Sequence, residues 1–281
     1  MNKILYKRII NPITIEMVIE APLIAKKAKP GQFIILRVNE NSERIPLTIA
    51  GVVDNGIKII FQVVGTTTTL LSKKEVGEYI EDFVGPLGKP TEIDNLKNVC
   101  VVGGGVGCAI ALPIAEALHK QGTKVISIIG FRNKDLVILE NDFNNCSDEL
   151  IVTTDDGSYA RKGNVTEPLK ELLEKNNFDK VITIGPIIMM KYVVETCKLF
   201  NVPCVVSMNP IMIDGTGMCG GCRLTLNING EKVTKFACVD GPDFDGYQID
   251  FDEANMRNKM YLDFEKHSYE NTCNLLNKEI K

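Results

Sequence analysis

The stretch VCVVGGGVGCAIALPIAEAL, Val99 to Leu118, places an apolar run, a glycine-rich turn and a helical pattern one after another. It is the least charged window of the chain, but its glycines, Pro113 and Glu116 interrupt it. This pattern predicts a buried strand, a tight turn and a helix rather than a membrane span.

Toward the C-terminus the same alternation continues. Apolar strand patterns at 99–102, 124–131, 149–156, 180–185 and 203–208 alternate with helical patterns at 110–122, 135–144, 165–177 and 187–201. Nearly continuous apolar strands that are separated by helices are typical of a parallel sheet covered on both faces. The middle of the chain is therefore expected to be an α/β domain.

The N-terminal part of the chain has a different pattern of apolar and turn residues. Residues 1 to about 92 contain short segments rich in Ile and Val, separated by Gly, Pro and Asn at fairly regular spacing, which predicts a small antiparallel β-barrel. The predicted fold class is β plus α/β: an N-terminal antiparallel barrel, a parallel-sheet nucleotide-binding domain and a C-terminal cysteine-bearing hairpin segment. The expected divisions are 1–94, 95–210, 211–250 and a helical tail at 251–281.

Composition excludes several functional classes. The 281 residues carry a formal net charge of −4, contain no Trp and are only 6% aromatic, so neither nucleic acid nor an anionic membrane surface is an expected partner. The N-terminus lacks the pattern of a signal peptide, and the cysteines outside 219–238 are most simply buried thiols of a reducing cytosol. A cytoplasmic location is expected.

The glycine-rich turn follows a strand and opens a helix, which is where a dinucleotide phosphate binds. It departs from the strict dinucleotide pattern, because Cys108 replaces the third glycine and the second strand ends in Gly130-Phe131-Arg132 without an acid. Taken alone, the turn is equally well explained by close packing of strand and helix. Two further turns, at 153–158 and 184–190, are expected at the same sheet edge, and together the three favour nucleotide binding.

The N-terminal half holds candidates for binding a flavin. Arg44 precedes Pro46-Leu47-Thr48 in a predicted strand, and Gly65 opens a run of four threonines. A cation, hydroxyls and backbone amides are what a flavin's pyrophosphate and ring edge require. An ordinary strand and a threonine-rich turn remain the alternative.

The strongest single motif is DGTGMCGGCR with FACVDG, which spaces Asp214, Cys219, Cys222 and Cys238 as D-x4-C-x2-C-x15-C. Structural zinc would need another Cys or His nearby, and a thioredoxin-type dithiol would not have a third cysteine. A plant-type [2Fe–2S] cluster uses C-x4-C-x2-C and a distant cysteine, and Asp214 stands where the first of these would be. A glycine loop with incidental thiols is the remaining alternative.

The barrel with R-x-P-L-T, the α/β domain and the cysteine hairpin together resemble the ferredoxin–NADP reductase superfamily. Within it, residues 1 to about 250 resemble the electron-transfer subunits of dihydroorotate dehydrogenase B. They are most similar to the small subunits of the electron-bifurcating NADH-dependent ferredoxin:NADP oxidoreductase family. SMNPIMIDGTGMCGGCR and FACVDGPDFDG are the most specific stretches.

The resemblance implies roles for particular residues. FAD is expected to contact Arg44, Pro46, Leu47, Thr48, Phe61, Val63, Gly65, Thr67 and Thr68, and NAD(H) to contact Gly104, Gly105, Asp155, Gly185 and Pro186. Cys219, Cys222 and Cys238 match cluster ligands. The flavin-stacking tyrosine of many superfamily members is replaced by Pro46, and the fourth cysteine of the orotate-linked subunits is replaced by Asp214, which favours the bifurcating relatives.

The function implied is hydride exchange between NAD(H) and FAD, with electrons relayed singly through a [2Fe–2S] cluster. No acid–base residue is nominated. A larger partner subunit with further flavin and iron–sulfur centres is expected, in a heterodimer or higher assembly, with ferredoxin reached through that partner. The alternatives are the electron-transfer subunit of NAD-dependent dihydroorotate dehydrogenase and a redox-sensing regulatory binding module. NADH is expected over NADPH.

The position of Asp214 predicts that it is the fourth cluster ligand. It precedes Cys219 by five residues and Cys222 by eight, as the first cysteine does in the plant-type spacing. In the alternative, Asp214 only caps the loop, and Cys204 or Cys273 is the ligand.

Overall fold

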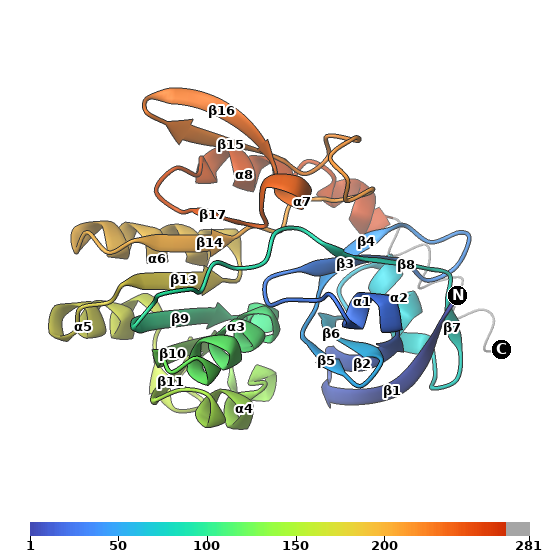
Figure 1. Cartoon of the computed structure of the whole chain (residues 1–281), viewed down its shortest axis with the longest axis horizontal. Helices are drawn as coiled ribbons and strands as arrows, with labels where there is room; N and C mark the ends of the chain where they lie inside the picture. The colour runs from blue at the N-terminus through green and yellow to red at the C-terminus, as the bar shows by residue number, and fades with distance from the viewer. Residues whose placement is uncertain (268–281) are drawn as a thin grey trace.

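The computed structural model describes residues 1–267, so Cys273 and the end of the expected helical tail lie outside the described residues. An N-terminal antiparallel unit and a parallel-sheet unit lie side by side, and the segment with the cysteines lies above both in the view of Figure 1. The mixed β plus α/β fold class is thus confirmed.

The N-terminal unit consists of two antiparallel sheets, ordered β5-β6-β2-β1-β7 and β4-β3-β8. Its elements are β1 (Asn2–Asn11), β2 (Thr14–Glu20), α1 (Pro22–Ala25), β3 (Phe33–Arg37), β4 (Ile45–Thr48), β5 (Gly51–Val53), β6 (Gly56–Gln62), α2 (Thr66–Lys73), β7 (Tyr79–Ile80) and β8 (Asp82–Leu87). The first two strands, β1 and β2, form an antiparallel hairpin. Pro12 lies at its turn, where the missing N–H costs no ladder bond.

Helix α2 occupies the place of the run of four threonines, where the alternative to a flavin site was an ordinary threonine-rich turn. Threonine has only modest helix propensity, but Gly65 caps the helix and the Thr68 hydroxyl accepts a hydrogen bond from the Gly65 N–H at 3.0 Å. Leu71, on the next turn, is fully buried in the core of the unit. Capping and burial therefore override the local propensity.

The second unit is a sheet ordered β12-β11-β10-β9-β13-β14-β17, parallel except for its last strand. Its elements are β9 (Asn98–Gly104), α3 (Cys108–Lys120), β10 (Lys124–Phe131), α4 (Glu140–Asn145), β11 (Glu149–Thr154), β12 (Arg161–Lys162), α5 (Thr166–Lys175), β13 (Lys180–Ile184), α6 (Ile187–Leu199) and β14 (Cys204–Ser207). α3 and α4 pack on one face, and α5 and α6 on the other. The helix predicted at 135–144 is shorter, because Leu139 has a left-handed φ of 59°.

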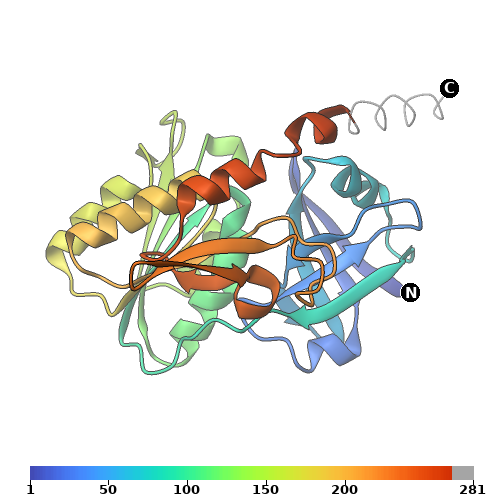
Figure 2. The same cartoon turned by 90° about the horizontal axis from the view of Figure 1, so that it is seen from above.

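The C-terminal segment forms the hairpin of β15 (Arg223–Ile228) and β16 (Glu231–Phe236), followed by α7 (Ala237–Asp240), β17 (Asp243–Asp245) and α8 (Phe251–Asn258). The sequence did not indicate that β17 would join the second unit's sheet, antiparallel to β14. Viewed from above, the hairpin and its loops lie over the region where the two units meet (Figure 2).

One hydrophobic core joins all three parts. Phe33 and Ile35 of β3 belong to the same buried cluster as Cys222, Leu224 and Cys238. A second, smaller cluster packs Ala50 and Ile60 of the first unit against Ala109 of α3. The candidate sites of the three parts are therefore held close together.

Within residues 1–267, none of the helices has both the length and the apolar character needed to cross a membrane.

Candidate functional site

The expected nucleotide turns lie at the carboxyl ends of parallel strands. Gly104 ends β9, Gly185 follows β13 and Asp155 follows β11. From β9 the chain adds β10, β11 and β12 on one side, and then β13 and β14 on the other. β9 and β13 therefore flank a topological switch point, where open α/β sheets bind ligands.

Close packing accounts for most glycines of these turns. A Cβ on Gly107 would lie 2.5 Å from the Ile184 carbonyl oxygen, and one on Gly185 would lie 3.2 Å from the Gly104 Cα. Gly105 differs, because its φ is +55° and a Cβ there would meet no atom within 4 Å. Gly105 therefore faces open space at the switch point, and this is the cradle that a phosphate group requires.

We expect Gly107→Ala to destabilise the fold by about 1–3 kcal/mol, because the added methyl overlaps backbone that cannot rotate away. Gly122→Ala is the matched control: Gly122 has a φ of +87° and open surroundings, so only about 1–2 kcal/mol of backbone strain is added. Denaturant unfolding measures the free energy of unfolding of both variants. The change in this free energy on addition of NADH then measures nucleotide binding. If Gly107→Ala loses no more stability than Gly122→Ala, the packing role of Gly107 is contradicted.

The Asp155 backbone N–H donates to the Phe131 carbonyl at 3.0 Å, which places the residue just beyond the β10–β11 pair. The side chain of Asp155 is exposed. Its neighbour Asp156 is committed to the turn, since it accepts hydrogen bonds from the N–H and hydroxyl of Ser158. Asp155 is thus the free carboxylate of this turn.

The flavin candidates begin on β4, which is an edge strand of the three-stranded sheet. Its residues Pro46, Leu47 and Thr48 are half-buried and pair on one side with β3. The other side of an edge strand has no strand partner, so its backbone N–H and C=O groups are free to hydrogen-bond a planar ring. Pro46 is tolerated at such an edge.

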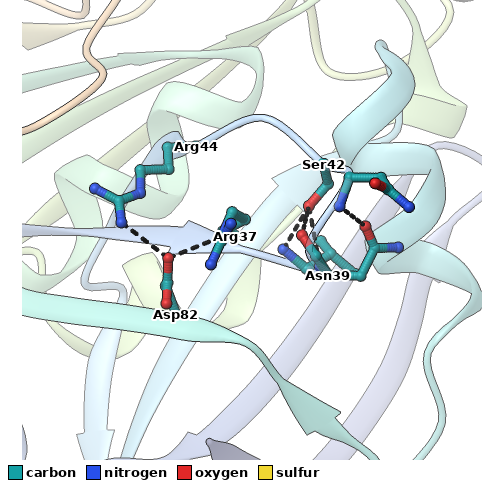
Figure 3. Close-up of polar contacts among 7 residues, drawn as sticks. Arg37, Asn39, Ser42, Arg44 and Asp82 are labelled. Carbon is teal, nitrogen blue, oxygen red and sulfur yellow. Dashed lines mark hydrogen bonds and ion pairs between the residues drawn. The ribbon is translucent and has the colours of Figure 1, made fainter.

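Arg44 is engaged by a residue that the sequence did not single out. One oxygen of Asp82 accepts from Arg44 at 3.0 Å and forms an ion pair with Arg37 Nε at 2.8 Å (Figure 3). Burial raises the pKa of Asp82, but the two guanidinium groups outweigh it and lower that pKa. The trio keeps one net positive charge, which suits a diphosphate.

The expected phosphate motif forms the N-terminus of α2. The Thr68 hydroxyl is already used, since it accepts from the N–H groups of Val64 and Gly65. By contrast, the buried Thr67 and Thr69 hydroxyls have no hydrogen-bond partner. Orphaned hydroxyls at a helix N-terminus match a phosphate ligand. Phe61 is only 2% exposed and packs in the core of the unit, so its side chain is not placed to contact a ligand.

The cysteine segment brings two of its predicted residues, Cys222 and Cys238, into contact. The sulfur atoms of Cys222 and Cys238 are 3.1 Å apart, too far for a disulfide, and Cys219 lies at the exposed end of the loop. Backbone N–H groups approach the sulfurs, from Gly221 to Cys219 at 3.4 Å and from Cys238 to Cys222 at 3.5 Å. Burial raises the pKa of Cys238 to about 12, and its contact with Cys222 adds to this.

Asp214 faces the same loop. One carboxylate oxygen accepts from the Thr216 N–H at 2.8 Å and the other from the Cys219 N–H at 2.7 Å. These hydrogen bonds lower the pKa of Asp214, and the bond from the Thr216 N–H has the largest effect. The carboxylate is therefore a loop cap, but its remaining lone pairs leave ligation open.

The donor set fits a two-iron cluster. Among residues 1–267, no three His, Cys, Asp or Glu side chains are arranged to hold a single metal ion. A two-iron cluster has a different requirement, since each iron takes two protein ligands. The alternative ligand Cys204 begins β14, where its thiol is hydrogen-bonded with Cys197. Cys273 lies outside the described residues.

Exposed apolar side chains surround the loop. Met218 is 88% exposed, and Ile211, Ile213 and Val239 are also accessible. Such a concentration of exposed apolar side chains in one segment is typical of a contact surface for another protein.

Comparison with known proteins gives a consistent result. Residues 209–250 match the family model described as the iron–sulfur cluster binding domain of dihydroorotate dehydrogenase B. A Thermotoga maritima protein named as a homolog of the electron transfer subunit of dihydroorotate dehydrogenase B (NAD(+)) is 46% identical, over 96% of this chain and 95% of its own length. The Streptococcus pneumoniae electron transfer subunit of that enzyme is 33% identical, over 86% and 97%.

Among solved structures, the chain is similar to one in a study of flavin-based electron bifurcation by the NADH-dependent reduced ferredoxin–NADP oxidoreductase. The TM-score is 0.90 and the identity 45%, with 96% of this chain and 97% of that chain covered. The similarity therefore extends over the two units and the cysteine segment together.

Proposed function

We propose, from the premise that this chain belongs to the family of electron transfer subunits of dihydroorotate dehydrogenase B, that it oxidises NADH and relays the electrons to a partner subunit. The observation that carries the proposal is the convergence of three sites on one core, which joins β3 to the cysteine loop. When bound, FAD and a [2Fe–2S] cluster would supply the conversion between two-electron and one-electron transfer.

In this proposal the antiparallel unit, for which the sequence predicts a small barrel, holds FAD. The free edge of β4 (Pro46, Leu47 and Thr48) hydrogen-bonds the ring. Arg44 neutralises the pyrophosphate, while the first turn of α2, which follows the cap Gly65 and includes Thr67, presents free backbone N–H groups. Val63, Phe61 and Thr68 support this site from the backbone or through the cap.

The nucleotide binds at the switch point. Gly104 and Gly105 bring backbone N–H groups to its phosphates, while Gly185 and Pro186 form the facing turn. Asp155 is positioned to accept hydrogen bonds from the sugar or the carboxamide. The contact of Ala109 with Ala50 and Ile60 keeps this turn close to the flavin-binding unit.

Asp214, Cys219, Cys222 and Cys238 hold the cluster. The buried thiols must lose their protons to bind iron, and the positive charge of the irons opposes the raised pKa of Cys238. N–H groups directed at the sulfurs then favour the thiolate form and tune the potential.

The partner is expected to dock on the apolar surface around Met218 and to carry further redox centres. The 45% identity to the structure from the bifurcation study favours such a complex, in which ferredoxin is reached through the partner. An orotate-oxidising partner is the second candidate, since relatives carry that name. Affinity purification from the native organism, followed by mass spectrometry, distinguishes the two, and recovery of no redox partner would contradict both.

We expect NADH to reduce the bound flavin faster than NADPH. No acidic residue ends β10 to repel a 2′-phosphate, but Arg132, the one cation just past that strand, is exposed and has no fixed geometry for binding one. Stopped-flow absorbance with each nucleotide measures the two rates. Arg132→Ala is the informative variant: because the exposed side chain is not fixed toward a 2′-phosphate, we expect its loss to leave both rates nearly unchanged. Faster reduction by NADPH in the native chain contradicts the expectation.

A further inference from the structure

Three segments that are far apart in the sequence meet beside the cysteine loop. They are residues 30–32 of the first unit, residues 88–91 at the start of the connection to the second unit, and residues 241–243 after α7. Figure 1 shows the connection passing from β8 across the molecule beneath α7 before it enters β9. We refer to this meeting point as the joint.

Backbone hydrogen bonds attach the connection on both sides. The Thr91 N–H donates to the Pro30 carbonyl at 3.0 Å, and the Gln32 side chain donates to the Gly88 carbonyl at 2.8 Å. On the other side, the Lys89 N–H donates to the Gly241 carbonyl at 2.7 Å. The connection is therefore bonded to the first unit and to the cysteine segment at the same time.

The joint is too tightly packed for larger residues at two positions. A Cβ on Gly31 would lie 2.1 Å from the Thr91 hydroxyl oxygen, and one on Gly88 would lie 2.9 Å from Pro242 Cδ. Both glycines also have positive φ angles, +84° and +74°. Such close packing of glycine backbone against neighbouring residues leaves little freedom for the three segments to shift relative to one another.

One side-chain bond completes the joint. The Thr91 hydroxyl donates to Asp243 Oδ2 at 2.6 Å, while Asp243 Oδ1 is inaccessible to solvent and has no partner. Burial raises the pKa of Asp243, and the hydrogen bond from Thr91 only partly opposes this. A half-satisfied buried carboxyl costs stability, so its presence requires another explanation.

That explanation lies in what Asp243 is attached to. It follows Cys238 by five residues and begins β17, while the cysteine loop rests on the first unit. A Cβ on Gly215 of that loop would lie 2.6 Å from Leu87 Cδ1 and 2.8 Å from Ile35 Cδ1. A displacement of Asp243 would therefore also move Cys238, a proposed cluster ligand. It would disturb the contact of the cysteine loop with β3 and β8.

We propose that Thr91 and Asp243 are positioning residues, which fix the cysteine loop at one distance and orientation from the flavin-binding unit. This inference rests on the proposed function, because the fixed geometry matters for electron transfer from flavin to cluster. Neither residue is among those proposed to bind the cofactors, and both act through the backbone segments that they join.

The test uses Thr91→Val, which keeps the size of the side chain and removes the donor. Thr14→Val is the matched control, because Thr14 is equally buried and its hydroxyl has no partner. In the full-length chain, hydrogen exchange should accelerate at the Lys89 and Met208 amides in Thr91→Val. The expected increase is roughly two- to tenfold, the shift for loss of one hydrogen bond. The Met208 N–H reports the joint because it donates to the Pro242 carbonyl.

The second readout is stopped-flow reduction by NADH. Thr91→Val should leave the rate of flavin bleaching unchanged and slow cluster reduction several-fold, because the rate of electron transfer falls steeply as the distance between two redox centres grows. Asp243→Asn still accepts the hydrogen bond from Thr91, so this variant should keep a near-native rate of cluster reduction. Asp243→Ala cannot accept that bond and should reduce the cluster more slowly.

If hydrogen exchange in Thr91→Val is unchanged at the Lys89 and Met208 amides, or rises evenly over the chain, the Thr91–Asp243 bond does not hold the joint together locally. Accelerated exchange with unaltered cluster reduction overturns the positioning role. Because the exchange experiment needs no cofactor, a failure of the proposed function would appear as absent flavin or iron and remain distinguishable.

Discussion

Replacing Asp214 with alanine is expected to remove most of the iron–sulfur cluster from the purified chain. Iron content should fall from about two atoms per chain, the content of one [2Fe–2S] cluster, to well below one. The reason is that the loop loses one of four ligands and the cap that holds the Cys219 N–H at 2.7 Å. Colorimetric iron and sulfide assays and EPR of the reduced protein measure the loss.

Asp214→Cys separates ligation from capping. A thiolate at this position can bind iron with the same charge but cannot accept both backbone hydrogen bonds of the loop. If Asp214 is a ligand, the cysteine variant should retain a [2Fe–2S] centre with altered g-values and reduction potential, since sulfur is a softer donor than oxygen. If Asp214 only caps, both variants should destabilise the loop without changing the spectrum of the cluster that remains.

Asp156→Ala is the matched control for this pair. Asp156 also closes a short turn by accepting a backbone N–H, from Ser158 at 2.9 Å, and it lies away from the cysteines in the second unit. Its loss removes a comparable cap and no proposed ligand. Iron content that falls equally in Asp156→Ala and Asp214→Ala would refute a specific role for Asp214.

The parallel sheet illustrates what sequence alone can predict. Strands such as 124–131 and helices such as 187–199 were evident from continuous apolar runs and helical periodicity, because burial on both faces imposes these patterns locally. Helix α2 was missed, since four threonines favour extended structure and the cap from Thr68 to Gly65 has no periodic signal. Tertiary burial of Leu71 decided the outcome.

The candidate sites also show that sequence alone does not reveal contacts between residues that are far apart in the chain. The cysteine motif was visible because its residues are close in sequence, with the exception of Cys238, which a hairpin returns to Cys222. Asp82 and Arg37 could not be found, because the pairing register of β3 and β8 brings them together. The contact of Thr91 with Asp243 likewise spans 152 residues and follows from β17 joining the sheet.

Replacing Arg44 with alanine is expected to release FAD from the chain. The trio of Arg37, Arg44 and Asp82 carries one net positive charge, and removing Arg44 leaves it neutral beside the proposed pyrophosphate. Loss of a charge-assisted bond costs about 1.5–3 kcal/mol, so flavin should bind roughly 10- to 150-fold more weakly. Flavin fluorescence titration of the apoprotein measures the affinity, and acid extraction with chromatography identifies the flavin.

Two further variants decide whether Arg44 acts on the flavin or on the fold. Asp82→Asn releases Arg44 from its ion pair and raises the net positive charge, so it should keep or strengthen flavin binding. Arg161→Ala removes a similarly exposed arginine that pairs with Glu171 in the second unit, and it should leave flavin binding unchanged. Weaker binding in Asp82→Asn would mean that the Arg44–Asp82 pair supports the fold. Recovery of FMN alone, or native affinity in Arg44→Ala, would show that this arginine does not neutralise an FAD pyrophosphate.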